Sequence, residues 1–75
     1  MNAAQCRMAR AALKLGVREL ADMAKVATGT ITRLEAGIEL KPRTLEAVKR
    51  ALERAGVAFT NGDEPGVKLK KKKKR

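Results

Sequence analysis

The sequence predicts a small, all-α domain of four to five helices that ends in a short β segment. Its 75 residues are enough for one domain. Apolar residues make up 44% of the chain, but Phe59 is the only aromatic residue, so small helices at close approach are favoured over a sandwich or barrel. Apolar residues also recur at helical spacing between glycine and proline stop signals.

The first helix is predicted over Ala3–Leu15. Cys6, Arg10 and Leu13 follow at i, i+4 and i+7, so they share one face. Gly16 is expected to end this helix, as a glycine after an apolar residue often does. Cys6 on that face is interpreted as an inert core thiol rather than a redox centre.

The next two helices are short and close together. We expect the second over Val17–Ala24, with its inward face formed by Leu20, Ala21 and Ala24. We expect the third over roughly Thr28–Ala36, with its inward face formed by Ile31, Leu34 and Glu35. Gly37 is a second stop signal.

A loop over Ile38–Pro42 precedes the fourth helix, because Pro42 disfavours helix at the residue before it. Thr44 is the expected cap, and it places Glu46 in the first turn, where the helix dipole favours an anion. The apolar stripe of this helix consists of Leu45, Val48, Leu52 and Ala55. Gly56 closes it.

The pattern changes after Gly56, which divides the chain into residues 1–56, 57–69 and 70–75. Val57–Thr60 contains β-branched and aromatic residues and predicts a strand. The following NGDEPG predicts a turn, and Val67–Leu69 predicts a second strand. Two strands are marginal alone, so they must lie on the helices or pair with another chain. A frayed tail and a dimer contact remain alternatives. Six consecutive cations, Lys70–Arg75, are expected to be disordered.

The composition argues against several function classes. The chain has no histidine, one cysteine and no glycine-rich phosphate loop, so we expect no enzyme, no metal site and no cofactor. A single cysteine forms no intrachain disulfide and fits a reducing compartment. The N-terminus lacks the apolar region of a signal peptide, and no apolar run could span a bilayer, so a cytoplasmic location is expected.

One segment carries the most information, ELADMAKVATGTITRLEAG over residues 19–37. Ala21 is small where two helices in a tight turn must touch, and Val26 and Ile31 hold the turn in the core. The pattern ELA-x4-V-x4-I-x2-LE-x-G resembles the Cro and phage-repressor (XRE-type) family of transcriptional regulators over about Arg10 to Leu52. The resemblance implies a lambda-repressor-like domain whose helix-turn-helix places its second helix in the DNA major groove.

Two charged residues, Arg10 and Glu35, point inward by their periodicity. Burial of either alone would be costly, so we expect an ion pair that fixes the fold and makes no DNA contact. The resemblance implies the same pairing between the first and third helices.

Base contacts are predicted on the outward face of the third helix, at Thr28, Gly29, Thr30, Thr32 and Arg33. The resemblance implies that Thr28, Gly29 and Arg33 face base edges. Arginine can donate two hydrogen bonds to guanine, which makes Arg33 the best candidate for specificity. Gly29 either lets the backbone approach the groove or merely weakens the helix by about 1 kcal/mol.

Phosphate contacts are predicted at Val17, Arg18, Lys25, Lys41 and Arg43. The resemblance places a glutamine at the position of Val17, so Arg18 is expected to take over that contact. Lys25 occupies a turn position that is often a left-handed glycine, at a cost of about 1 kcal/mol. Ala27 stands where the family usually has a capping Ser or Thr.

Net charge completes the functional hypothesis. The chain carries +10, and removing the six terminal cations leaves +4 on residues 1–69, so both parts attract phosphate. We expect a sequence-specific regulator of double-stranded DNA, a repressor that binds an inverted repeat as a homodimer without a small-molecule effector. The alternatives are a protein-interaction module such as an antitoxin, and a non-specific nucleic-acid binder driven by the lysine tail.

Overall fold

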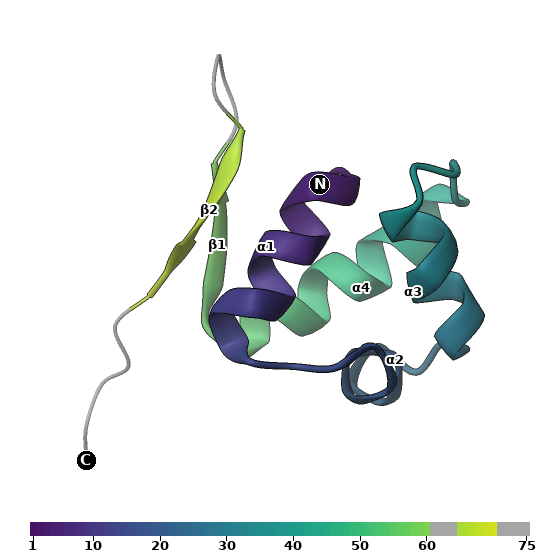
Figure 1. The fold of residues 1–75 in the computed structure, drawn as a ribbon, viewed down its shortest axis with the longest axis horizontal. Helices are drawn as coiled ribbons and strands as arrows, with labels where there is room; N and C mark the ends of the chain where they lie inside the picture. Colours follow the sequence, from purple (N-terminus) through teal and green to yellow (C-terminus); the bar gives the residue numbers. More distant parts are fainter. Residues whose placement is uncertain (61–64, 71–75) are drawn as a thin grey trace.

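A computed structural model describes residues 1–60 and 65–70 of the chain. Within these ranges, a small and mostly helical domain ends in a two-stranded antiparallel sheet (Figure 1). The elements are α1 (Ala3–Leu13), α2 (Val17–Ala24), α3 (Thr28–Glu35), α4 (Pro42–Arg54), β1 (Val57–Thr60) and β2 (Gly66–Leu69). Among the described residues, no helix has both the length and the apolar content needed to cross a membrane.

The core lies where α1, α2, α3 and α4 meet. Its largest fully buried side chains are Leu20, Ile31, Leu52, Val48, Val57 and Cys6. Three alanines belong to the same core: Ala9, Ala21 and Ala51 are at most 3% exposed. Small side chains let helix backbones pack closely, which explains how a core without a fully buried aromatic residue is filled. The inward residues predicted for α2 and α3 are therefore confirmed.

The strand pair lies against the helices (Figure 1), with β1 and β2 contacting α1 and β1 also contacting α4. Val57 pairs with Leu69, and Phe59 pairs with Val67. Val57 is fully buried, whereas Phe59 and Val67 are partly buried against the core. These contacts supply the hydrophobic support that an isolated hairpin lacks. Within the described residues, the frayed-tail alternative is therefore wrong.

Three helices end in the same way, with a left-handed residue followed by an apolar one. The left-handed residues are Lys14 (φ 58°), Lys25 (φ 60°) and Gly37 (φ 89°). In each case the N–H of the next residue donates to a carbonyl five positions back, at 2.9–3.0 Å for Leu15, Val26 and Ile38. This is the hydrogen bond of the Schellman motif. The left-handed conformation expected at Lys25 is confirmed.

The predicted end of α1 is wrong by two residues. The helix stops at Leu13 because Lys14, not Gly16, adopts the left-handed conformation. Gly16 has φ −83° and instead precedes α2, where its N–H donates to Glu19 Oε1 at 2.7 Å. A similar but smaller difference occurs in α3, which ends at Glu35 rather than at residue 36.

The start of α4 also differs from the prediction. The helix begins at Pro42 with Lys41 as its extended N-cap, so Thr44 is not the cap. Proline suits the first helical position because its φ is preset and its missing N–H would be unpaired there. Glu46 is consequently beyond the first turn and pairs with Arg50 one turn later, at 3.0 Å.

Two predictions near the C-terminus fall largely outside the described residues. Residues 61–64 of the predicted turn and residues 71–75 of the basic run are in this category. Lys70 is described, and its N–H donates to the carbonyl of Gly56 at 2.6 Å.

Candidate nucleic-acid interface

Residues 25–27 connect α2 to α3 in a tight turn. Ala21 on α2 is 1% exposed and Ile31 on α3 is fully buried, so the two helices bury one face each in the core. Lys25 ends α2 in a left-handed conformation, and Val26 packs partly buried against the core. Ala27 precedes α3 without a side-chain cap, as the sequence indicated. The face of α3 opposite Ile31 is therefore presented to solvent.

Four of the five predicted base-contact residues lie exposed on that face: Thr28, Gly29, Thr32 and Arg33. Thr30, which was predicted to face outward, is instead half-buried, because it lies on the side of α3 that is closer to the core. The accessible surface of α3 is thus made of small and hydroxyl-bearing side chains with one arginine.

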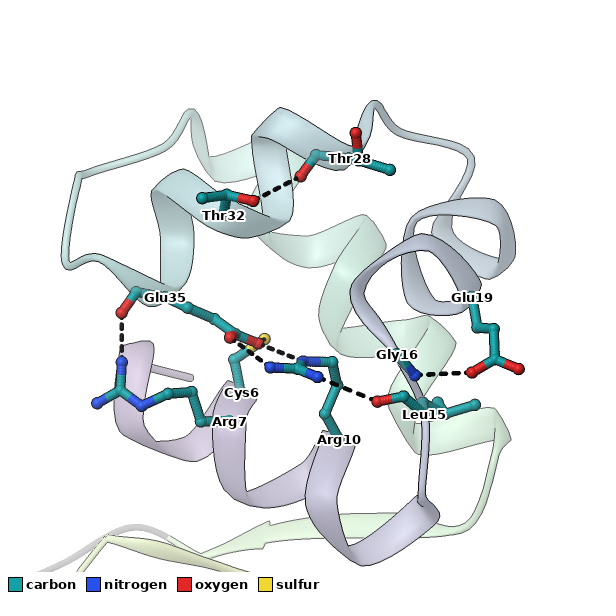
Figure 2. A network of polar contacts seen from close by, with 9 residues as sticks. All are labelled: Cys6, Arg7, Arg10, Leu15, Gly16, Glu19, Thr28, Thr32 and Glu35. Atoms are coloured by element: carbon teal, nitrogen blue, oxygen red, sulfur yellow. Dashed lines mark hydrogen bonds and ion pairs between the residues drawn. The ribbon is translucent and has the colours of Figure 1, made fainter.

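Hydrogen bonding within α3 further distinguishes its threonines. The Thr32 hydroxyl donates to the Thr28 carbonyl at 3.2 Å (Figure 2). Because its proton is engaged within the helix, Thr32 offers a methyl group and oxygen lone pairs to a ligand. The spacing i, i−4 permits this bond, but the sequence alone does not show that it forms.

Gly29 lies in the first turn of α3 and has no left-handed conformation to justify a glycine. A Cβ atom at this position would meet Arg33 Nη1 at 4.0 Å, which is ordinary van der Waals contact. The fold therefore tolerates alanine at position 29. The same distance shows that the Arg33 guanidinium extends back over the first turn.

Four predicted phosphate-contact residues are exposed: Arg18, Lys25, Lys41 and Arg43. They lie in the first turn of α2, in the α2–α3 turn and at the start of α4. Val17 differs, because its side chain is partly buried against the core and anchors α2. Its contribution to anion binding is limited to its backbone N–H at the positive end of the α2 dipole.

The ion pair expected between Arg10 and Glu35 is present (Figure 2). Arg10 Nε lies 2.7 Å from Glu35 Oε2, and Arg10 Nη2 lies 2.8 Å from Oε1, so the carboxylate is held by two parallel bonds. Arg10 Nη1 also donates to the Leu15 carbonyl at 3.1 Å. Since the side chains are only 23% and 11% exposed, this pair ties α1 to the end of α3.

Cys6 and Arg7 extend this network. Cys6 Sγ donates to Glu35 Oε2 at 3.3 Å, and Arg7 donates to the Glu35 backbone carbonyl. The hydrogen bonds from Arg10 hold the pKa of Glu35 below its usual value, and Glu35 in turn raises the pKa of Arg10. Burial, reinforced by Glu35, raises the pKa of Cys6 to about 12. Cys6 is therefore a protonated donor at neutral pH, which is the chemistry of an unreactive core thiol.

Gln5 is a structural residue that the sequence reasoning missed. It is 2% exposed, and its Nε2 donates to the Thr60 carbonyl at 2.9 Å and to the Gly66 carbonyl at 3.0 Å. Gln5 also exchanges bonds with Asn2 in a capping box. The Asn-x-x-Gln spacing signals that cap. No local pattern signals the bonds to strands that are more than 50 positions away.

Within residues 1–60 and 65–70, no three His, Cys, Asp or Glu side chains gather as a metal site. Comparison of the sequence with protein-family models and with curated proteins found no match. The function is therefore inferred from the geometry of the residues described above.

Proposed function

We propose that the protein is a sequence-specific regulator of transcription that binds double-stranded DNA through α3. One observation supports this most strongly: α3 presents an exposed face, and exposed cations stand in the neighbouring segments on both sides of it in the sequence, at Arg18 and Lys25 before it and at Lys41 and Arg43 after it. An α-helix fits the major groove, and cations in the segments next to it can then reach backbone phosphates.

Residues of α3 supply the base contacts in this proposal. Thr28 and Gly29 belong to the first turn, which is the part of a recognition helix that enters the groove most deeply. Arg33 follows Gly29 by one turn on the same exposed face, so its two donors can bind the O6 and N7 atoms of guanine. Thr32 presents its methyl group for contact with a thymine methyl.

Cations from three segments provide affinity without sequence preference. Arg18, Lys25, Lys41 and Arg43 contact phosphates and fix the register of α3. This arrangement, together with the Arg10–Glu35 pair between α1 and α3, supports placing the chain in the Cro and phage-repressor (XRE-type) family with a lambda-repressor-like fold. Such a regulator works in the cytoplasm, where its one thiol stays reduced.

We further propose that it acts as a homodimeric repressor. One copy of α3 contacts only a few base pairs, and two copies on successive major-groove turns, about 34 Å apart, multiply the specificity. The strand pair is the proposed dimer contact, because within residues 1–60 and 65–70 each strand pairs with another strand along one edge only, and Leu69 at the end of β2 is 58% exposed. A second copy can bind the other edge and cover the leucine.

Two arginine variants test this proposal by fluorescence anisotropy on two duplexes, one selected from a random pool and one with its bases scrambled. Arg33→Ala should weaken the selected duplex by about 1–3 kcal/mol and leave the scrambled one almost unchanged. Arg43→Ala is the matched control: it should weaken both duplexes equally and reduce the salt slope by about 1. An equal loss on both duplexes for Arg33→Ala would remove it from base recognition.

A further inference from the structure

A groove between α2 and α4 is not explained by contact with the major groove. Its volume is about 460 Å³ and it is open to solvent. It runs from the α2–α3 turn at Lys25 to the C-terminal turn of α4 at Arg54. Most of its length therefore lies beyond the phosphate-contact residues proposed above.

The floor of this groove is apolar. Met23, Ala47 and Ala51 line it, and Met23 is 38% exposed. Methionine is unbranched and adapts to different apolar partners. The two alanines follow one another at i and i+4 on α4, so the floor is shallow and leaves room for side chains from another molecule.

The rim of the groove is strongly basic. Four cations and one carboxylate line it, which leaves a net charge of +3. Arg50 pairs with the carboxylate of Glu46 at 3.0 Å. In the described part of the chain, Lys25, Arg43 and Arg54 form no ion pair. The groove therefore combines an apolar floor with three uncompensated positive charges.

We propose that this groove docks an acidic amphipathic helix of a partner protein. Arg43, Ala47, Arg50 and Arg54 follow at i, i+4, i+7 and i+11 along one stripe of α4, which spans about 16 Å. A helix lying beside that stripe places apolar residues at i, i+3, i+4 and i+7 on the floor and carboxylates against the rim. Complementary charge favours an acidic partner and opposes a basic one.

Nucleic acid fits this groove less well. A single strand is held by aromatic side chains on which bases stack, and no aromatic residue lines the groove. Lys25 and Arg43 on the rim can donate to phosphate oxygens, but the apolar floor between the cations offers a nucleic-acid strand no donor. The chemistry of the groove is thus that of a protein-binding site.

Docking has a regulatory consequence that rests on the proposed function. Lys25 and Arg43 line the groove and are also proposed phosphate contacts. A partner helix whose carboxylates engage both cations removes them from DNA. The partner and DNA therefore exclude one another, and an acidic protein can relieve repression without any ligand-induced change of fold.

Peptide selection tests the docking site directly. A displayed library of random peptides, each about 15 residues long to allow four helical turns, is selected on the full chain and depleted on an Ala47→Glu/Arg54→Glu variant. The enriched peptides should be acidic, with apolar residues at helical spacing. Their affinity in anisotropy should fall about tenfold or more in the double variant, equivalent to 1.4 kcal/mol.

Lys49→Glu is the matched control for Arg54→Glu, since it also replaces a cation on α4 by a carboxylate, at a residue that does not line the groove. It should change peptide affinity less than twofold. Arg54→Ala, at an exposed position, provides a second groove variant if Ala47→Glu impairs folding as judged by circular dichroism. Absence of enriched peptides, or equal binding to groove and control variants, would overturn the docking site. Loss of duplex binding in Arg54→Ala equal to its loss of peptide binding would assign the groove to nucleic acid instead.

Competition separates this inference from the proposed function. An enriched peptide should displace the selected duplex from the protein. If peptides require the groove but leave duplex binding intact, mutual exclusion is wrong. If peptides require the groove and the protein binds no duplex selectively, the docking site stands and the proposed function fails.

Discussion

The ion pair between Arg10 and Glu35 is the most direct link between α1 and α3, so its removal tests how the domain is held together. Arg10→Met removes the guanidinium but keeps an unbranched chain. The Glu35 carboxylate then loses its two shortest hydrogen bonds, at 2.7 and 2.8 Å, and the Leu15 carbonyl loses a third at 3.1 Å. Since both side chains are less than a quarter exposed, water restores only part of this solvation.

The expected cost follows from these contacts. Removing one partner of a fully buried pair costs about 3–5 kcal/mol of unfolding free energy, and partial exposure lowers this to about 2–3 kcal/mol here. The double variant Arg10→Met/Glu35→Leu buries no unpaired charge and should cost less than either single variant. We therefore expect a coupling energy of more than about 2 kcal/mol in the double-mutant cycle.

The same pair predicts a pH dependence. The folded-state pKa of Glu35 lies below its unfolded value of about 4.3, because Arg10 donates to its carboxylate. The resulting stabilisation is present above about pH 4.3 and is lost as the pH falls through the folded-state pKa. The difference in stability between wild type and Arg10→Met should therefore shrink on acidification from pH 7.

Urea unfolding followed by circular dichroism measures these free energies, because the chain has no Trp or Tyr for fluorescence. Single variants that each cost less than about 0.5 kcal/mol would show that the pair does not stabilise the fold. Simple additivity of the two costs would show that the residues do not act together.

Further substitutions have equally definite outcomes. Lys14→Gly and Lys25→Gly should each raise the free energy of unfolding in urea by about 1 kcal/mol, because glycine relieves the left-handed strain. Lys25→Gly should also lower the salt slope of DNA binding by about 1. An unchanged slope would exclude a phosphate contact at residue 25. Gly29→Ala should raise the thermal midpoint, while a large loss of DNA affinity would show that the backbone at residue 29 approaches the groove. Gln5→Leu should lower the free energy of unfolding in urea by about 1–3 kcal/mol and speed amide exchange in the hairpin, since two strand carbonyls lose their donor. Unchanged amide exchange would contradict this role of Gln5. With a pKa of about 12, Cys6 should react with iodoacetamide at pH 8 about three orders of magnitude more slowly than a free thiol, and rapid labelling of the folded protein would contradict its burial.

Much of the fold follows from local sequence. The bounds of α2 and β1 match the prediction because apolar spacing, composition and stop signals agree there. The Arg10–Glu35 ion pair was predictable for a different reason. Both charges occupy inward positions, and burial of either one without a partner would be costly.

The errors occur where two local signals compete. Lys14 rather than Gly16 ends α1: Lys14 is left-handed although glycine adopts φ > 0 more easily, and the Leu15 N–H completes the Schellman bond to the Arg10 carbonyl. Pro42 begins α4 two residues before the expected Thr44 cap, because proline is as suitable at the first helical position as threonine is at the cap.

The candidate site was predictable in outline and not in detail. The spacing placed Thr28, Gly29, Thr32 and Arg33 on an exposed face. The engagement of the Thr32 hydroxyl depends on a rotamer, which no sequence pattern specifies. The α2–α4 groove forms where two helices more than 15 residues apart in the sequence pack together. Neither its floor nor its rim therefore appears as a local sequence motif.

Selection of bound duplexes from a random pool at near-physiological salt tests DNA recognition most directly. The geometry predicts enrichment of an inverted repeat with half-site centres about 10 base pairs apart, matching two copies of α3 on one face of the duplex. Each half-site should contain a guanine that Arg33 contacts. When this guanine is replaced, wild type and Arg33→Ala should bind the duplex with the same affinity. A pool that remains random while the protein still binds duplex DNA would contradict recognition by α3.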